Sequence, residues 1–310
     1  MTVVFLVLAS TLLFVIPACS QTTLETIFIR PDGSVYPSAA PIQQNGNTYT
    51  FTDNFYGAIR IQKSNIVLDG AGFTLHGPYD GAVSDIWFIG EGTGQLAKSM
   101  QVQYTIGVDL GSSSVEGVVI ENLNIKNFSI GMYVWTRNNT VVGNAVSENI
   151  IGILLSGSNA TVTKNFIANN QRGLFFGFNN AEGTIPSDIM INRNAFENNV
   201  VQLNGCECKD YNTTEFPHNW DDGKEGNYWS DYNGTDTNND GIGDTPYFID
   251  ILNQDRFPLM QSPAKPQVLH PKIPVEAIIL GVLASVVLPV ALFAFKKRKK
   301  KQKSKRSHLL

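Results

Sequence analysis

The body of this 310-residue chain lacks clustered basic residues. Nine of its 23 Lys and Arg side chains lie together between Lys296 and Arg306, in a stretch without Asp or Glu. The chain before Lys296 is therefore strongly acidic, although the formal net charge of the whole is only −4. Proteins that bind the phosphate backbone depend on clustered Lys and Arg. We therefore expect no nucleic-acid partner.

Cysteine, histidine and methionine are scarce as well, with three, four and five copies. Cys206 and Cys208, with His218 ten residues further on, are the residues that suit a soft metal such as Cu(I) or zinc. One nearby histidine and the lack of a Met-rich patch argue against copper. In an external compartment we expect a Cys206–Cys208 disulfide or a free pair of thiols.

Both ends of the chain are apolar and indicate export. Residues 1–20 have the apolar core and small terminal residues of a signal peptide but lack its basic start, so an uncleaved anchor is the alternative. Residues 275–295 include 19 uncharged residues in a row, close to the roughly 20 that a membrane-spanning helix needs. The basic tail, 296–310, predicts a cytoplasmic C-terminus and leaves the body of this single-pass protein outside.

Five Asn-x-Ser/Thr sequences lie in the part predicted to be external. They permit glycosylation of Asn127, Asn138, Asn159, Asn212 and Asn233.

The middle of the chain repeats itself. The copies begin at intervals of 22, 21 and 29 residues, and each carries a second asparagine five residues after the first. The first asparagines of the copies are Asn122, Asn144, Asn165 and Asn194. A period of this length is typical of a solenoid.

The segments between the asparagines are short and rich in β-branched residues, which predicts strands such as Thr140-Val141-Val142. A strand, a turn and a second strand that recur about every 22 residues predict an all-β, right-handed, single-stranded parallel β-helix. Identical turns of such a helix stack about 4.8 Å apart, so each asparagine can hydrogen-bond to its counterparts above and below. We therefore assign the repeated asparagines a structural role.

The predicted organisation has seven parts. They are a signal peptide (1–20), an N-terminal cap segment (21–47), β-helix turns (48–208), a C-terminal cap (209–262), a linker (263–274), a transmembrane α-helix (275–295) and a cytoplasmic tail (296–310).

The body resembles the NosD-like family of periplasmic copper-binding β-helices, a group also described as carbohydrate-binding and sugar-hydrolysis β-helices and common in archaeal surface proteins. The matching segments span roughly Thr26 to Met260, and the most specific ones lie near the end. They are 65–72 (NIVLDGAG), 226–232 (GNYWSDY), 240–247 (DGIGDTPY) and 253–260 (NQDRFPLM). The resemblance implies a β-helix, with roles that range from reductase maturation and surface architecture to polysaccharide contact.

The C-terminal cap contains a loop with the oxygen spacing of calcium sites. Oxygen-bearing side chains at loop positions 1, 3, 5 and 9 surround a glycine at position 6, namely Asp236, Asn238, Asp240 and Asp244 around Gly241. Position 12 is Tyr247 rather than glutamate, so Asp231 or Asp250 would have to complete the shell. A metal-free Asn/Asp/Gly turn is the alternative.

Four aromatic residues of the same cap could stack on sugars or close the open end of the solenoid: Trp220, Tyr228, Trp229 and Tyr232. We regard them as candidate ligand-binding residues and favour the closing role.

The sequence favours binding over catalysis. A sugar-cleaving β-helix needs paired carboxylates, or a calcium cluster with a basic residue, on one face. The charged residues of the repeats are scattered singly: Glu121, Glu148, Lys164, Arg172 and Arg193. We therefore expect a membrane-anchored extracellular protein that binds surface glycans, envelope polymers or proteins. A polysaccharide hydrolase or lyase and a copper-handling maturation factor are the alternatives.

Overall fold

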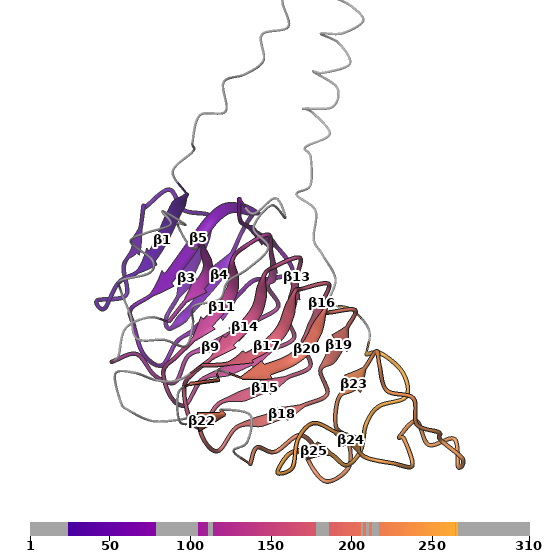
Figure 1. The fold of residues 1–310 in the computed structure, drawn as a ribbon. Coiled ribbons are helices and arrows are strands. Elements are labelled where there is room, and N and C mark those ends of the chain that lie inside the picture. The colour runs from indigo at the N-terminus through magenta and orange to yellow at the C-terminus, as the bar shows by residue number, and fades with distance from the viewer. Residues whose placement is uncertain are drawn as a thin grey trace, which may run out of the picture. The chain divides into compact units, whose positions relative to one another are not determined.

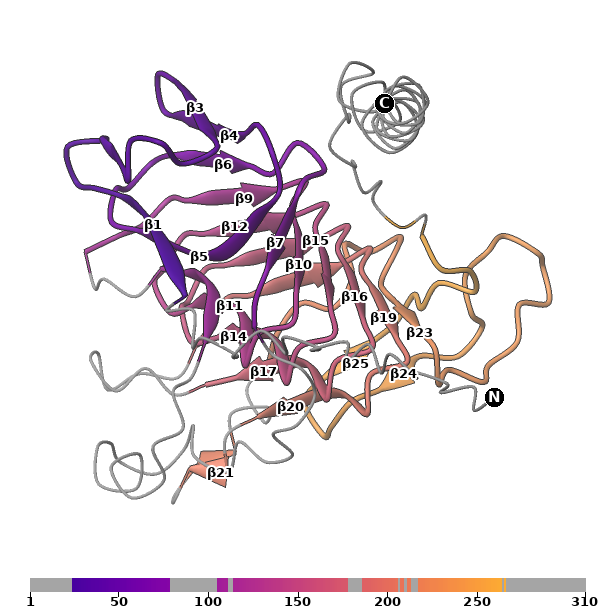
Figure 2. The same ribbon diagram turned by 90° about the horizontal axis from the view of Figure 1, so that it is seen from above.

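The computed structural model describes residues 24–78, 105–110, 114–177, 186–205, 207–208, 211–212, 217–263 and 265. Every regular element in these ranges is a β-strand (Figures 1 and 2). The all-β class predicted from the sequence is confirmed for this part of the chain.

Three strand positions recur along the chain, and like positions pair in parallel to form three sheets, except that the first two strands of sheet 1 form an antiparallel pair. Sheet 1 contains β3 (Ile42–Asn45), β4 (Thr48–Phe51), β6 (Val67–Asp69), β9 (Val119–Glu121), β12 (Thr140–Val142), β15 (Thr161–Thr163) and β18 (Met190–Asn192). Sheet 2 contains β7 (Thr74–His76), β10 (Asn124–Lys126), β13 (Ala145–Ser147), β16 (Phe166–Ala168), β19 (Ala195–Glu197) and β23 (Tyr228–Trp229). Sheet 3 contains β1 (Glu25–Ile29), β8 (Ile106–Asp109), β11 (Ile130–Val134), β14 (Ile151–Leu155), β17 (Arg172–Phe176) and β20 (Val201–Gly205).

The strand β5 (Phe55–Ile61) joins sheets 2 and 3, because its first residues pair with β7 and its later ones with β1 and β8. Short antiparallel pairs complete the described strands. They involve β2 (Val35–Tyr36), β21 (Glu207–Cys208), β22 (Tyr211–Asn212), β24 (Tyr247–Phe248) and β25 (Gln254–Asp255).

One strand from each sheet, taken in chain order, forms a rung, for example β12, β13 and β14. Successive rungs stack in register, so that the same inward position carries an apolar side chain at every level. In sheet 1 this column consists of Leu68, Ile120, Val141, Val162 and Ile191, each at most 1% exposed. Crossovers between parallel strands are right-handed in nearly all proteins, and the arrangement is that of a right-handed parallel β-helix.

Each rung turns three corners, and each corner holds one residue with a left-handed backbone. The corner before sheet 1, for example, places Asn138 and Asn159 at φ of 61° and 55°. Asparagine and glycine tolerate this region, whereas other side chains are strained there. Lys164 and Arg193, with φ of 57° and 55°, nevertheless occupy the corner between sheets 1 and 2.

The β-helix extends past both boundaries predicted from the sequence. At the N-terminal end β1 already pairs in parallel with β5. At the C-terminal end Asn219 bridges to Met190 of sheet 1, and β23 pairs with β19 of sheet 2. These outer turns lack the two asparagines five residues apart, which is why the repeat did not reveal them.

The chain divides into two compact units, 1–267 and 268–310. The predicted signal peptide, residues 79–104 and 178–185, the predicted transmembrane segment 275–295 and the basic tail lie outside the described residues. Within the described ranges there is no helix long and apolar enough to cross a membrane.

Candidate functional site

Four buried asparagines form a continuous hydrogen-bonded column at the corner between sheets 1 and 2, here called the first ladder. The Nδ2 of Asn144 donates to Oδ1 of Asn165 at 3.0 Å, Asn165 to Asn194 at 3.0 Å, and Asn194 to Asn227 at 2.9 Å. Each of the four is at most 1% exposed. Each of the first three Nδ2 groups therefore donates one N–H to the next asparagine toward the C-terminal end, and it also donates to a backbone carbonyl of the preceding rung, for example Asn165 to Val141 at 2.8 Å.

Asn122 does not belong to this ladder, which corrects the alignment of the repeats. Leu123 occupies the register position of Asn144, and its N–H donates to Asn144 Oδ1 at 3.0 Å. Asn122 instead takes the left-handed corner position at φ 53°, and its exposed amide donates to Asp69 Oδ1 at 3.2 Å. The alignment of the repeats places Asn122 one residue away from the true ladder position. The sequence alone does not distinguish an asparagine at a corner from an asparagine in the ladder.

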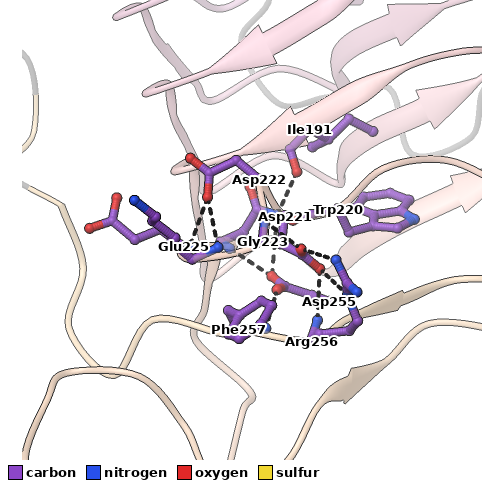
Figure 3. Close-up of polar contacts among 11 residues, drawn as sticks. Ile191, Trp220, Asp221, Asp222, Gly223, Glu225, Asp255, Arg256 and Phe257 are labelled. Atoms are coloured by element: carbon purple, nitrogen blue, oxygen red, sulfur yellow. Dashed lines mark hydrogen bonds and ion pairs between the residues drawn. The ribbon is translucent and has the colours of Figure 1, made fainter.

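The first ladder ends on a carboxylate that the sequence did not single out (Figure 3). Asp255 Oδ2 accepts from the N–H of Asn227 at 2.6 Å, from its Nδ2 at 3.3 Å and from Nε1 of Trp229 at 2.9 Å, while Oδ1 accepts from the N–H of Phe257 at 3.1 Å. Asp255 is fully buried, and burial raises the pKa of its carboxyl to about 6 against the pull of these donors.

Ion pairs lie around the C-terminal end of the first ladder. Arg256 donates from Nη2 and Nε to the buried Asp221 at 2.6 and 3.0 Å (Figure 3). Arg193 binds Asp222 and Glu225 from the adjoining corner. The Arg256 pair anchors the returning chain 253–257 to the last rung, and the Arg193 pairs join that rung to the one before it.

A second ladder runs along the corner between sheets 2 and 3 and reaches the surface. Asn149 donates to Asn170 at 3.0 Å, Asn170 to Asn199 at 2.9 Å, Asn199 to Gln202 Oε1 at 2.9 Å, and Gln202 Nε2 to Ser230 Oγ at 2.8 Å. The first ladder thus ends in the core, whereas the second ends at a hydroxyl beside a pocket.

The glycines of sheet 3 make room for this second ladder. A Cβ at Gly152 would lie 2.5 Å from the carbonyl of Gly173 and 3.1 Å from Nδ2 of Asn170. Gly131 and Gly173 have equally close neighbours. The recurring glycine seen in the sequence is therefore explained by close approach of the next rung.

The pocket beside Ser230 has a volume of about 470 Å³ and lies between β20 and β24. Its walls combine amide, hydroxyl and carboxylate groups with apolar side chains. The lining residues are Asn199, Val200, Val201, Gln202, Leu203, Ser230, Asp231, Tyr247, Phe248 and Ile249.

Trp220 and Trp229, two of the four candidate ligand-binding aromatic residues, lie in the core and not on the surface. Trp220 and Trp229 are 2% and 1% exposed. Trp229 is stacked between Phe196 at 4.5 Å and Tyr247 at 4.3 Å, so both of its faces are covered. Their rings close the end of the β-helix and are not open to a ligand.

Tyr228 and Tyr232, the other two, are partly exposed. Tyr228 bridges to Leu259, and the hydroxyl of Tyr232 donates to the carbonyl of Thr245 at 2.6 Å. Both hold the returning chain, and neither lines the pocket.

A family model described as periplasmic copper-binding protein (NosD) matches residues 42–234, more than half of the chain. The chain belongs to the NosD family. The match covers the stacked rungs and the second ladder down to Ser230, and it confirms the resemblance noted in the sequence. No curated protein matches the chain.

The copper named in the family description has no preformed site in the described part of this NosD-family chain. There, no three His, Cys, Asp or Glu side chains are grouped so that they could hold a metal ion. Cys206 and the side chain of Cys208 lie outside the described residues, so their disulfide stays a prediction.

His218 is buried in the cap and stacks on Phe176 with ring centroids 4.6 Å apart. Neither ring nitrogen has a hydrogen-bond partner among the described residues. Burial lowers the pKa of His218 to about 4, although Asp250 and Asp188 act to raise it. His218 is therefore neutral at pH 7.

The predicted calcium loop of this NosD-family protein is folded around its own backbone. Asp236 Oδ2 accepts from the N–H of Gly241 at 2.9 Å, Asn238 Oδ1 from Asp240 at 3.1 Å, and Asp240 Oδ1 from Ile242 at 2.9 Å. These bonds bring the first three predicted ligands to one side of the turn.

Of the remaining predicted calcium ligands, Asp244 is hydrogen-bonded to the start of the loop, and Asp231 and Asp250 are bonded to residues outside it. Asp244 accepts from the hydroxyl of Thr235 at 3.1 Å and the N–H of Thr237 at 3.0 Å. Asp231 accepts from the Tyr247 hydroxyl, and Asp250 accepts from the Asn253 amide. The loop is thus closed by hydrogen bonds of its own side chains, those of Asp244 to Thr237 among them.

The predicted glycosylation sites fall mostly at corners. Asn127, Asn138 and Asn159 occupy left-handed corner positions, and Asn233 is exposed in the cap. Asn159 Nδ2 donates to Asn138 Oδ1 at 2.6 Å, so these two lie on adjacent rungs. The side chain of Asn212 lies outside the described residues.

One pair of carboxylates was missed by the sequence reasoning, because its members are 52 residues apart. Asp69 and Glu121 are directly opposite each other on β6 and β9 and face outward. Burial, followed by the charge of Asp69, raises the pKa of Glu121. Two adjacent carboxyl groups, one of them with a raised pKa, have the chemical character of an acid and base pair.

Proposed function

We propose that the protein is a membrane-anchored extracellular binding protein that presents the flank of its β-helix to an envelope carbohydrate. The apolar segment 275–295 and the basic tail after it support the anchor, and the NosD family description places related proteins outside the cytoplasm. Solenoids provide long surfaces for extended ligands.

The observation that carries the proposal is the polar outer face of sheet 1. One outward column contains Asp69, Glu121, Val142, Thr163 and Asn192 in register, and Thr163 Oγ1 donates to Oδ1 of Asn192, which is 6% exposed, at 2.7 Å. Neighbouring strands repeat at about 4.8 Å. Asp69, Glu121 and Thr163, which are partly exposed, offer donors and acceptors to a polymer with many hydroxyls on three of these strands.

The proposal is tested with the full-length chain in detergent on an array of immobilised polysaccharides. We expect saturable binding to at least one polymer and no release of shorter sugars. The double variant Thr163→Val with Asn192→Leu removes the polar pair on this face and should weaken binding by about tenfold. Binding that is unaffected by this variant, or no polymer bound at all, would contradict the proposal.

The paired carboxylates favour a second candidate, a polysaccharide hydrolase. Directly opposite side chains on neighbouring strands lie close to the separation of roughly 5 Å that retaining glycosidases use. Prolonged incubation with each bound polymer and analysis of the products would decide. Cleavage that is lost in Glu121→Gln, with binding retained, would replace the binding function by this one.

Calcium binding by residues 236–244 is a further part of the proposal. Hard cations prefer several oxygens around a tight turn, and Asp236, Asn238 and Asp240 supply three side chains around Gly241. Elemental analysis of the purified chain should find calcium and no copper. Copper retained through dialysis and lost when Cys206 and Cys208 are replaced by Ser would instead indicate metal handling.

A further inference from the structure

Sheet 3 ends one rung before the other two sheets. The last rung supplies a bridge at Asn219 to sheet 1 and β23 to sheet 2. In sheet 3, β20 pairs with β17 on one edge, and no strand of the described chain follows it on the other edge (Figures 1 and 2). The place of one further parallel strand is therefore open in the described part of the chain.

The pocket occupies that place. One wall is formed by β20 with the residues just before it, one end by Ser230 and Asp231 directly after β23, and the opposite wall by β24. After Trp229 the chain leaves the rung and returns only at Tyr247. The hollow of about 470 Å³ is thus bounded by two strands, β20 and β24, with room between them.

The hydroxyl of Ser230, which lines this hollow, has a free hydrogen-bond donor among the described residues. Ser230 Oγ accepts from the N–H of Asn198 at 3.0 Å and from Gln202 Nε2 at 2.8 Å, which uses both of its lone pairs. Among the described residues it donates to no acceptor. Each amide of the second ladder donates one N–H to the next member. The chain of amides therefore polarises the O–H of Ser230.

The rim of the pocket is apolar with one negative charge. Val200 and Phe248 are 81% and 71% exposed, unusually open for side chains of this size, and Val201 is 39% exposed. Asp231 is exposed at the same rim. The ring of Tyr247, the other aromatic side chain of the pocket, has one face stacked on Trp229.

We propose that this pocket is a docking site for an extended segment of a partner protein, which adds to β20 as the next strand of sheet 3. An open strand edge recognises extended polypeptide through main-chain hydrogen bonds, and flanking pockets select its side chains. The partner segment carries apolar side chains for Val200 and Phe248, a basic side chain for Asp231, and a carbonyl that accepts the Ser230 hydroxyl.

The natural partner is represented by a probe taken from the chain itself. The strand that already pairs with β20 is β17, in register from Arg172 with Val201 to Phe176 with Gly205. A blocked, fluorescently labelled peptide with the sequence of residues 171–177, Gln-Arg-Gly-Leu-Phe-Phe-Gly, has the apolar and basic composition required. Its binding to the full-length chain in detergent is followed by fluorescence anisotropy, with empty micelles as blank.

Matched variants separate the pocket from general apolar adhesion. Phe248→Ser and Val200→Lys change exposed pocket residues, whereas Ile251→Ser changes a residue that is 83% exposed but does not line the pocket. We expect the first two to weaken peptide binding by about tenfold or more and the third to leave it within about twofold. Amide exchange of residues 201–203 should slow when the peptide is bound.

Several outcomes would overturn the proposal. They are the absence of saturable binding up to about 1 mM peptide, equal affinity in all three variants, or equal affinity for a peptide with Glu in place of its Arg. Because the pocket is distinct from the outer face of sheet 1, polysaccharide binding without peptide binding would reject this inference and leave the proposed function standing.

Discussion

The carboxylate of Asp255 accepts a 2.6 Å hydrogen bond from the backbone N–H of Asn227 at the C-terminal end of the first ladder. Each ladder amide donates from Nδ2 toward this end, so the group that closes the ladder has to accept and not donate. An ionised Asp does this with both oxygens. The N-terminal end of the ladder needs a donor instead. The N–H of Leu123 is this donor, and it donates to Asn144 Oδ1.

Replacing Asp255 by Asn should therefore destabilise the protein, although the two side chains have the same shape. One amide –NH₂ would face either the Trp229 and Asn227 donors or the N–H of Phe257. A buried donor left without an acceptor costs about 1–3 kcal/mol. Thermal or chemical unfolding at pH 7 measures the loss. Asp53→Asn, on an exposed residue, is the control and should change stability by less than about 0.5 kcal/mol.

Much of the fold could be predicted because the repeat is regular. The strand at Thr140–Val142 and its apolar centre follow from β-branched residues, and the stacked amides of Asn144 and Asn165 follow from the 21-residue interval. The alignment failed at Asn122, where no spacing tells a corner asparagine from a ladder asparagine.

The corner residues give a second prediction. Lys164 holds φ 57°, a conformation that costs a residue with a Cβ roughly 1 kcal/mol and that asparagine tolerates better. Lys164→Asn should raise the free energy of unfolding by about 0.5–1 kcal/mol. Lys126→Asn, made within the strand β10, should bring no gain, because asparagine is disfavoured in strands. A stabilising Lys126→Asn or a destabilising Lys164→Asn would show that backbone strain is not the controlling factor.

The candidate sites were less accessible to sequence reasoning than the fold. Trp220 and Trp229 remained candidate ligand-binding residues beside the favoured closing role, because proximity in sequence does not reveal burial. The pocket at Ser230 depends on where sheet 3 stops, and Asp69 meets Glu121 only because two rungs stack across 52 residues. Some rungs lack the repeated asparagines. Contacts between such rungs cannot be recognised from a periodic pattern in the sequence.

Calcium addition provides a third prediction. If the loop 236–244 binds the ion, millimolar calcium should raise the melting temperature of the full-length chain by several degrees, because a ligand bound only to the folded state stabilises it. Asp236→Asn keeps one oxygen for the Gly241 N–H but removes a charge, and should abolish most of the shift. Glu116→Gln, outside the loop, should keep it. A shift that survives Asp236→Asn would place calcium elsewhere.

The buried His218 and Asp255 give a fourth prediction, because burial shifts their pKa values in opposite directions. For His218 the folded pKa of about 4 lies below the ordinary value of 6.5, so the unfolded chain binds more protons and stability rises with pH across this window. For Asp255 the folded pKa of about 6 lies above 3.8, so stability falls as pH rises between these values. Each contribution amounts to about 3 kcal/mol, and between pH 4 and 6 the two nearly cancel.

Replacing one of these two residues should make the pH dependence that the other contributes measurable. His218→Phe keeps a ring against Phe176 and removes the nitrogens that lack partners, so relative to the wild type its free energy of unfolding should fall by about 2–3 kcal/mol from pH 4 to pH 6. Asp255→Asn, over the same range, should show a rise of similar size. Urea unfolding at half-unit pH intervals measures both differences. Since other titrating groups are common to all three proteins, two flat difference curves, or two of the same sign, would mean that burial does not set these pKa values.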